Sequence, residues 1–311
     1  MHEFTERDIL KICYLYYQEA KTQAEISKIF GVSRFKISRT LKEAKQRKLV
    51  TITINDPKGD LTETEIKLAD KYGLNQAIVV KINEFSEKSL VDQVAEAAAE
   101  YLAQSIGFYR IMGVTWGHTV YRVVAHLKPI AVKNLTLVQI SGGLGTIEGT
   151  DNNMLTITLG QKLGAKAKVI PAPAIVRNRE IRDTLFKEKK IQDTLKTAKK
   201  ADIVLFGVGM IGGYGLLWRS GFLKEKDAVR LKKAGAVGSI CGRFFNAKGE
   251  ICWPVLDDRT IGLTLDELRQ IKHKICVATG YEKVEGVLGG LNNKLINVLI
   301  TDDRTAARLL N

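Results

Sequence analysis

From Gln76 onward, short apolar runs alternate with stretches of helical periodicity, and this alternation restricts the possible folds more than any other feature. The apolar runs expected to form strands are 77–81, 111–114, 135–140, 169–171, 203–207, 275–278 and 298–301. The expected helices between them are 90–106, 117–127, 154–163, 184–200 and 227–234. Such alternation is typical of an α/β domain with a mostly parallel sheet. In these sheets ligands bind at the carboxyl ends of the strands.

A second pattern, over residues 22–48, predicts two helices joined by a tight turn. Thr22 and Glu25 have the spacing of a capping box that starts the first helix. Gly31 is expected to end that helix, and Ser33 to cap the next one. The expected buried stripes are Ile26, Ile29 and Phe30 on the first helix and Ile37, Leu41 and Ala44 on the second.

The opposite face of the second helix is basic, and segment 21–48 holds nine Lys or Arg residues against two Glu. An exposed Phe35 among cations is unusual for a solvated face, but it suits contact with a thymine methyl group. The simpler alternative is a surface helix pair in a helical bundle. Spacing, turn and charge together favour helix-turn-helix DNA binding. The candidate DNA contacts are Thr22, Gln23, Ser33, Arg34, Phe35, Lys36, Ser38, Arg39 and Lys42.

The sequence around this motif suggests the domain boundaries. A helix over 6–17 is expected to pack behind the two motif helices, and the alternating run 49–55 is expected to form a strand. Residues 56–60, DPKGD, then break the chain. We expect a helix-turn-helix (winged-helix-like) domain over 1–56, a linker and possible dimer helix over 57–75, and an α/β effector-binding and oligomerisation domain over 76–311.

The composition narrows the class of protein. The 311 residues carry a formal net charge of +14, which favours a polyanionic partner. Four scattered cysteines without a CxxC pattern argue for a reducing cytosol and against structural zinc. No apolar run approaches membrane-spanning length, and the N-terminus lacks a signal-peptide pattern. We therefore expect a cytoplasmic protein with no metal and no membrane partner.

Two glycine-rich segments follow expected strands, GVTWGHT at 113–119 and SGGLGT at 141–146. Small residues let backbone N–H groups approach an anion, and hydroxyl groups add donors. Either segment alone could be a tight turn, but two after neighbouring strands favour an anion-binding pocket. A Thr115 nucleophile elbow is disfavoured because no convincing base accompanies it. The candidate residues are Gly113, Thr115, Trp116, Gly117, Thr119, Ser141, Gly142 and Gly143.

A third glycine-rich segment, 207–212, formally matches the dinucleotide fingerprint. Glycines at 213, 215 and 221 are incompatible with the helix that this fingerprint requires. We interpret the segment as another wall of the pocket, with Gly207 and Gly209 as candidates.

Two basic residues are further candidates. Lys283 follows a strand near a helix start, where the helix dipole disfavours a cation unless an anionic ligand lies beside it. It is either a surface lysine or a ligand contact, and the neighbouring loops favour contact. Arg243 lies in an expected hairpin turn over 242–249 and is either a phosphate clamp or a surface charge.

Seven motifs occur in a characteristic order: QAEISKIFGVSRFKISRTLKEA, GVTWGHT, SGGLGT, FGVG, GAVGSICGRFFNAKGE, ATGYEK and LITDDRTAARLL. Together they resemble the SorC/DeoR-type family of bacterial sugar-responsive transcriptional regulators over essentially the whole chain. The resemblance implies an N-terminal helix-turn-helix domain and an effector domain similar to sugar-phosphate isomerases. It also implies a phosphorylated sugar effector and assembly into homodimers or homotetramers.

The resemblance implies effector contacts at Thr115, Trp116, Gly117, Thr119, Ser141, Gly142, Gly143 and Lys283, with Arg177 and Arg243 as further positions. Two departures from the family pattern matter. Phe35 and Lys36 stand where many relatives have Pro-Thr, so the operator sequence cannot be transferred. Ser141 stands where some relatives have Lys, which argues against a covalent imine with an aldehyde sugar.

The expected partners are a pseudo-palindromic double-stranded DNA operator and a sugar phosphate, with no cofactor and no catalytic residues. The alternative is a sugar-phosphate isomerase or deaminase-like enzyme with an appended DNA-binding segment. The fold does not separate these functions, but no matched acid and base stand out. A third possibility, RNA binding, is disfavoured because an aromatic platform is missing.

Overall fold

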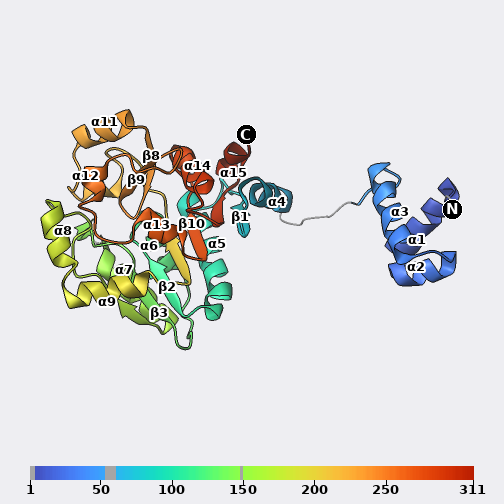
Figure 1. Cartoon of the computed structure of the whole chain (residues 1–311), viewed down its shortest axis with the longest axis horizontal. Helices are drawn as coiled ribbons and strands as arrows, with labels where there is room; N and C mark the ends of the chain where they lie inside the picture. The colour runs from blue at the N-terminus through green and yellow to red at the C-terminus, as the bar shows by residue number, and fades with distance from the viewer. Residues whose placement is uncertain (1–3, 53–60, 148–149) are drawn as a thin grey trace. The chain divides into compact units, whose positions relative to one another are not determined.

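The computed structural model describes residues 4–52, 61–147 and 150–311. The chain divides into two compact units, residues 1–59 and 60–311, whose helices and strands are labelled in Figure 1. Among the described residues, no helix has both the length and the apolar character that crossing a membrane requires.

The described part of the smaller unit, residues 4–52, contains three helices: α1 Glu6–Tyr17, α2 Gln23–Phe30 and α3 Arg34–Gln46. The predicted capping box is present, since the Thr22 hydroxyl accepts from the Glu25 N–H and the Glu25 carboxylate accepts from the Thr22 N–H. Gly31 has φ 62°, a left-handed conformation that permits the tight turn before α3. The core contains Ile9, Ile12, Cys13, Leu15, Ile26, Ile37, Leu41 and Ala44.

One predicted core position in this unit is wrong. Ile29 is exposed, whereas Ile26 is buried and Phe30 packs against the same core. The core therefore covers the α2 stripe only along the edge that holds Ile26 and Phe30.

The larger unit contains a seven-stranded parallel sheet in the order β1-β11-β10-β7-β2-β3-β6. Its strands are β1 Gln76–Val80, β2 Ile111–Val114, β3 Thr136–Gln139, β6 Lys166–Lys168, β7 Ile203–Phe206, β10 His273–Val277 and β11 Val298–Asp302. Two antiparallel pairs are β4 Thr146–Ile147 with β5 Thr150–Asp151, and β8 Ala236–Ile240 with β9 Arg243–Asn246.

The helices of the larger unit are α4 Leu61–Tyr72, α5 Leu90–Ser105, α6 His118–His126, α7 Asn152–Leu163, α8 Arg179–Leu185, α9 Lys189–Ala198, α10 Leu216–Arg219, α11 Glu225–Lys233, α12 Pro254–Asp257, α13 Leu265–Arg269, α14 Val284–Asn292 and α15 Asp303–Leu310. Short 3-10 helices are η1 Ile106–Phe108 and η2 Tyr281–Lys283.

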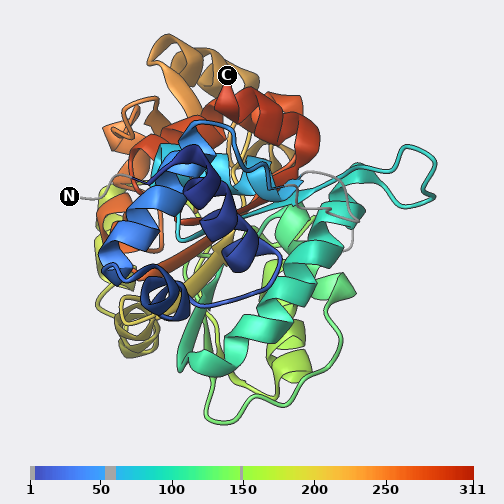
Figure 2. The same cartoon turned by 90° about the vertical axis from the view of Figure 1, so that its right-hand side faces the viewer.

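Both faces of the sheet are buried, as a parallel sheet requires. In β7, Val204 and Phe206 pack into one apolar cluster, whereas Ile203 and Leu205 pack into another. Residues of α5, α6 and α7 belong to the second cluster, and residues of α4, α9, α13, α14 and α15 belong to the first. The unit therefore has three layers, and Figure 2 shows α5 (turquoise) running along one side of the sheet. The predicted α/β class with a mostly parallel sheet is confirmed.

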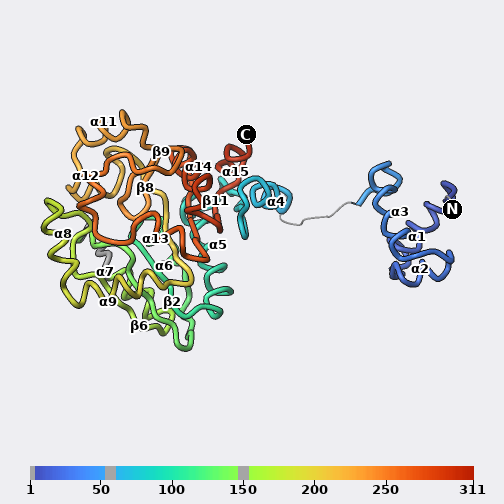
Figure 3. Tube along the Cα trace, in the orientation of Figure 1, coloured from blue at the N-terminus to red at the C-terminus, as the bar shows by residue number. Residues whose placement is uncertain are grey.

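The hairpin β8–β9 forms a smaller group with α11 and α12, which Figure 3 shows at one end of the larger unit. Cys241 and Gly242 make its two-residue turn, with φ values of 54° and 79°. Left-handed conformations at both positions are typical of a tight hairpin turn. The expected turn over 242–249 is thus corrected, because Arg243–Asn246 is the second strand.

Helix α4, expected in a linker, packs on the larger unit. Its Leu68 is fully buried, and the Glu65 carboxylate accepts a 2.8 Å hydrogen bond from the Val79 N–H. At its end, the Tyr72 hydroxyl donates to the Leu309 carbonyl, and Lys71 Nζ donates to the Leu310 carbonyl at 2.7 Å. Helix α4 is therefore attached to α15 and β1.

The single helix expected over 184–200 is two helices, α8 and α9. Leu185 and Ile191 both pack into one cluster with Leu195. In a continuous helix, Leu185 and Ile191 would point in directions about 120° apart around the axis. The break between α8 and α9 lets both side chains reach the same core.

Two predicted strands are also corrected. Residues 169–171 are not a strand, since the Ile170 N–H binds the Gln139 side chain and Pro171 has no N–H to donate. Residues 49–52 are not a strand either, because the Leu49 N–H closes the end of α3 on the Ala44 carbonyl. The remainder of that predicted strand, 53–55, lies outside the described residues.

Candidate functional site

The larger unit contains a cavity of about 340 Å³ lined by the segments after β2, β7 and β10. These three strands are neighbours in the sheet, so the segments meet at its carboxyl edge. The β8–β9 turn, α10 with the residues before it, and the start of α5 complete the wall. The cavity brings together these predicted residues: Trp116, Gly117, Thr119, Gly207, Gly209 and Lys283.

The N-terminus of α6 faces this cavity through His118 and Thr119. Gly117 precedes the helix, and no side chain of the described residues caps it. The first N–H groups of a helix have no partner within the helix, and the helix dipole favours negative charge there. This end of the cavity is therefore suited to an anion.

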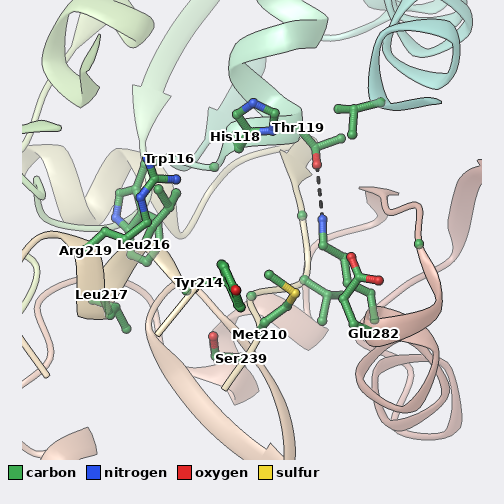
Figure 4. Close-up of a pocket in the computed structure, with 18 of the residues that line it drawn as sticks. Trp116, His118, Thr119, Met210, Tyr214, Leu216, Leu217, Arg219, Ser239 and Glu282 are labelled. Atoms are coloured by element: carbon green, nitrogen blue, oxygen red, sulfur yellow. Dashed lines mark hydrogen bonds between the residues drawn. The ribbon is translucent and has the colours of Figure 1, made fainter. Parts of the chain in front are cut away.

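Lys283 supplies a cation at the same end of the cavity. Its Nζ donates a 3.4 Å hydrogen bond to the Thr119 hydroxyl, drawn as the dashed line in Figure 4. Within the described parts of the chain, no carboxylate forms an ion pair with it. Burial lowers the pKa of Lys283, and the nearby Glu282 carboxylate opposes this shift only in part. A half-buried ammonium group with so little compensation would be stabilised by a bound anion.

His118 adds an uncharged polar group. Burial lowers the pKa of His118, and the nearby charges of Lys283, Arg122 and Arg219 lower it further. Near neutral pH the ring is therefore uncharged, with one nitrogen as donor and the other as acceptor. The lining also contains the Ser239 hydroxyl and the Glu282 carboxylate, so it offers donors and acceptors for sugar hydroxyl groups.

A buried carboxylate holds the segment after β10 in place. Asp302 accepts hydrogen bonds from the Thr279 hydroxyl at 2.5 Å, the Thr305 hydroxyl at 2.6 Å and the Gly280 N–H at 3.3 Å. Burial alone would raise the pKa of Asp302, but these hydrogen bonds outweigh it and lower the pKa. Asp302 therefore stays ionised and fixes Thr279 and Gly280, which line the cavity.

Five predicted contacts lie behind the wall of the cavity. The Thr115 and Ser141 hydroxyls bind each other at 2.6 Å, and both residues are buried. Trp116 Nε1 donates a 3.0 Å hydrogen bond to the Gly142 carbonyl. The structure thus places the segment after β3 as a brace for the segment after β2. The predicted residues outside the lining are Gly113, Thr115, Ser141, Gly142 and Gly143.

Close packing explains why positions 113 and 142 are glycines. A Cβ atom at Gly113 would lie 2.6 Å from side-chain atoms of Ile140 and Val204, and one at Gly142 would lie 2.4 Å from the Pro173 carbonyl oxygen. Both positions require a residue without a side chain, whatever the cavity binds.

Arg243, the expected phosphate clamp, does not line this cavity. Arg243 is buried in β9, where its Nε donates to the Leu263 carbonyl and its guanidinium pairs with Asp257 at 2.6 Å. Its remaining nitrogen donates to the carbonyls of Thr260 and Gly262. Arg243 thus cross-links the hairpin to the chain around α12. Arg177 is exposed and does not line the cavity either.

Several lining residues were not among the predicted contacts: His118, Met210, Tyr214, Arg219, Ser239 and Glu282. His118 lies in the motif GVTWGHT and Glu282 in ATGYEK, so the predicted contacts next to them in sequence could have indicated both residues. Ser239 reaches the cavity through the β8–β9 hairpin, whose position beside the sheet no local pattern indicates.

In the smaller unit, the predicted DNA contacts lie on α3 and at the starts of α2 and α3. Phe35 is 78% exposed, and Arg39 and Lys42 are exposed beside it. Lys36 is half-buried, with its ammonium group 4.6 Å from the centre of the Phe4 ring. The Thr22 and Ser33 hydroxyls cap α2 and α3. The remaining predicted contacts are exposed or half-buried: Gln23, Arg34 and Ser38.

We predict that the affinity of the cavity for phosphate falls as the pH rises toward the ordinary lysine pKa of about 10.4. Because the pKa of Lys283 is lowered, its proton is lost at a lower pH than that of an exposed lysine. A bound dianion favours the charged form, so affinity is highest below the lowered pKa. Calorimetric titration with inorganic phosphate measures this effect. Lys283→Arg keeps its charge over this range, and an equal fall in that variant would contradict the assignment.

Comparisons with known proteins agree with this architecture. A family model described as a sugar-binding domain matches residues 56–311. The deoxyribonucleoside regulator of Bacillus subtilis (strain 168) is 36% identical over 298 residues, covering 96% of this chain and 95% of that protein. The sorbitol operon regulator of Klebsiella pneumoniae is 29% identical over 308 residues, covering 98% of each.

Solved structures show the same relationship. The full-length sorbitol operon regulator SorC from Klebsiella pneumoniae matches with a TM-score of 0.76 and 29% identity, over 98% of this chain and 99% of that chain. A DeoR family transcriptional regulator from Listeria monocytogenes matches with a TM-score of 0.75 and 30% identity, over 80% of this chain and 98% of that chain. The chain therefore belongs to the SorC/DeoR-type family of transcriptional regulators with a sugar-binding domain.

Proposed function

We propose that this chain is a DNA-binding transcriptional regulator of a carbohydrate-utilisation operon, and that a phosphorylated sugar bound in the larger unit changes its affinity for DNA. The observation that carries the proposal is the Lys283 ammonium group, held with the Thr119 hydroxyl beside the uncapped N-terminus of α6. The named relatives include a sorbitol operon regulator and a deoxyribonucleoside regulator, which supports a sugar-derived effector.

In this proposal the phosphate lies between Lys283 and the first turn of α6. Glu282, Ser239 and the neutral His118 are placed around the rest of the cavity, where they can bind sugar hydroxyl groups. A cavity of about 340 Å³ is within the size range of small-molecule sites.

The effector half of the proposal predicts that Lys283→Met abolishes sugar-phosphate binding without lowering the stability of the ligand-free protein. Methionine has a similar volume and removes a half-buried, poorly compensated charge. Thermal-shift screening of the parent against ribose 5-phosphate, 2-deoxyribose 5-phosphate, glucose 6-phosphate and sorbitol 6-phosphate identifies a ligand by its stabilisation. Lys187→Met, at an exposed lysine outside the cavity, is the matched control. Equal ligand-induced shifts in both variants would place the site elsewhere.

The DNA half of the proposal predicts that Arg39→Ala weakens operator binding by about 1–3 kcal/mol if Arg39 contacts a base. Arg39 is exposed on α3, so its removal leaves the three-helix core intact. Lys11→Ala removes one charge from an exposed position on α1 and serves as the control. Gel-shift titrations over a range of salt concentrations separate a base contact from a phosphate contact. Loss of a phosphate contact lowers the slope of log affinity against log salt concentration by about one, whereas loss of a base contact leaves that slope unchanged. Identical DNA affinities for both variants would show that α3 does not bind in the DNA groove.

We also propose that the operator is a pseudo-palindromic double-stranded site bound by a homodimer or homotetramer. One reading helix contacts only a few base pairs, so specific regulators pair two half-sites. Light scattering of the full chain determines the number of copies directly, and a monomer bound to a long footprint would contradict this part.

We propose that effector binding in the cavity influences the DNA-binding unit through α15 and α4. Thr279 and Gly280 line the cavity and bind Asp302, which caps α15. The carbonyls at the end of α15 accept hydrogen bonds from Lys71 and Tyr72 of α4. Helix α4 follows the DNA-binding unit directly in sequence. A ligand that prefers one arrangement of these helices would change DNA binding, whereas equal affinity for two arrangements would change nothing.

This route predicts that Tyr72→Phe leaves sugar-phosphate affinity within about twofold but reduces the effect of the ligand on DNA affinity. The substitution removes one hydrogen bond of about 1 kcal/mol between α4 and α15. Tyr121→Phe, on α6, is the control. Calorimetry and ligand-dependent gel shifts measure the two quantities separately. An unchanged DNA response with normal ligand binding would rule out the α4 route.

An isomerase or deaminase is the alternative function, because Glu282 and His118 both line the cavity and such an enzyme could use them as acid and base. We propose that they bind rather than react, in keeping with the regulator relatives. A turnover assay on the same sugar phosphates decides between the two, since a regulator returns its ligand unchanged.

A further inference from the structure

Tyr214 lines the cavity, yet 88% of it is exposed to solvent. Its hydroxyl has no hydrogen-bond partner among the described residues. The neighbouring Trp218 is fixed, because its Nε1 donates to the Lys224 carbonyl at 3.0 Å and its ring packs edge-on against Phe244. Tyr214 is thus an aromatic side chain at the cavity whose apolar face is not packed against the protein.

The segment that carries Tyr214 is anchored at both ends and open in the middle. At one end, Gly209 and Ser239 exchange backbone hydrogen bonds of 2.8 and 3.0 Å. At the other, Gly215 is packed so closely that a Cβ atom would lie 2.8 Å from the Trp218 ring. Between them, Gly212 has φ 115°, and neither Gly212 nor Gly213 has any atom within 4 Å of a Cβ position. Ile211 packs against the apolar cluster that contains Phe244, so residues 212–214 are the part of the segment with backbone freedom and space to move.

The two ends of the cavity differ in chemistry. Thr119 and Lys283 form one end, which is suited to an anion, whereas Leu216 and Leu217 lie toward the other end beside Arg219 (Figure 4). Figure 4 shows Tyr214 between Thr119 on one side and the two leucines on the other. A ligand whose phosphate is bound at Lys283 would therefore extend its remaining atoms beneath the Tyr214 ring.

We propose that residues 212–214 close over the effector, and that the Tyr214 ring covers the C–H face of a sugar phosphate in its closed-ring form. A furanose or pyranose ring presents adjacent C–H groups on one face, and a rigid aromatic ring gains contact area there at a low entropy cost. An open-chain polyol phosphate has the same phosphate but no fixed apolar face. Tyr214 is thus a specificity-determining residue. This inference rests on the proposed function, because it takes the phosphate to be bound at Lys283.

Two matched ligand pairs test the ring preference: glucose 6-phosphate against sorbitol 6-phosphate, and ribose 5-phosphate against ribitol 5-phosphate. In the parent chain we expect the ring member of the bound pair to bind about tenfold more tightly, which corresponds to about 1.4 kcal/mol. In Tyr214→Ser we expect this ratio to approach one, and in Tyr214→Phe we expect it to be retained. Inorganic phosphate reaches only the Lys283 end, so its affinity is expected to stay within about twofold in both variants. Tyr121→Ser, at another partly exposed tyrosine, is the control.

Closure of the segment has its own measurement. Chymotrypsin cleaves after exposed aromatic residues, so we expect cleavage after Tyr214 in the free protein. We expect protection by the ring sugar phosphate and none by inorganic phosphate at an equal degree of saturation.

The outcomes separate this inference from the proposed function. If the parent binds a sugar phosphate but Tyr214→Ser binds it equally well, or if ring and open-chain members bind alike, the role of Tyr214 is wrong and the proposed function stands. If cleavage after Tyr214 is not slowed by the bound sugar phosphate, closure is wrong. If the parent binds inorganic phosphate but no sugar phosphate, the proposed function fails and this inference fails with it.

Discussion

The candidate site of the larger unit is organised around one poorly compensated charge. The Lys283 ammonium group is half-buried at the edge of a parallel sheet, and its hydrogen-bond partner among the described residues is Thr119 at 3.4 Å. Such a charge costs free energy in the ligand-free protein, because an anion would stabilise it better than the protein does. The polar groups behind the cavity, in contrast, form hydrogen bonds within the protein. Thr115 is paired with Ser141, and Asp302 is saturated with hydrogen bonds. Residues whose polar groups are already hydrogen-bonded thus hold the poorly compensated Lys283 ammonium group where a ligand can reach it.

The fold was largely predictable because it depends on periodicity. Apolar runs of strand length, separated by helical stretches, located six of the seven strands of the sheet to within two residues at each end. The errors arose where tertiary contacts overrode local pattern. The helix expected over 184–200 breaks so that Leu185 and Ile191 can share one core, and the Leu49 N–H closes α3 instead of joining a strand. A sequence shows the apolar stripe of a segment, but it does not show which neighbour will cover that stripe.

The site was predictable only in part, for a different reason. A glycine-rich segment indicates that another group lies close to the backbone. The sequence does not show whether that group is a part of the protein or a ligand. At Gly142 it is the Pro173 backbone, whereas Gly117 and Gly207 line the cavity. Arg243 looked like a phosphate clamp because its sequence neighbours resemble a turn, yet hydrogen bonds within the protein occupy its guanidinium group. Tyr214 carried no signal at all, since an exposed tyrosine in a loop is ordinary until the cavity beside it is known.

The cavity is assembled from separate parts of the chain, and this has an evolutionary consequence. Lys283 is held by the sheet and the Asp302 network, whereas residues 210–214 are an external segment between two fixed glycines. Mutations in that segment can alter which sugar is accommodated while the charged end and the core remain intact. Duplicated genes could therefore diverge in the nutrient they sense through changes in these five positions, and a library restricted to them would be a compact starting point for new biosensors.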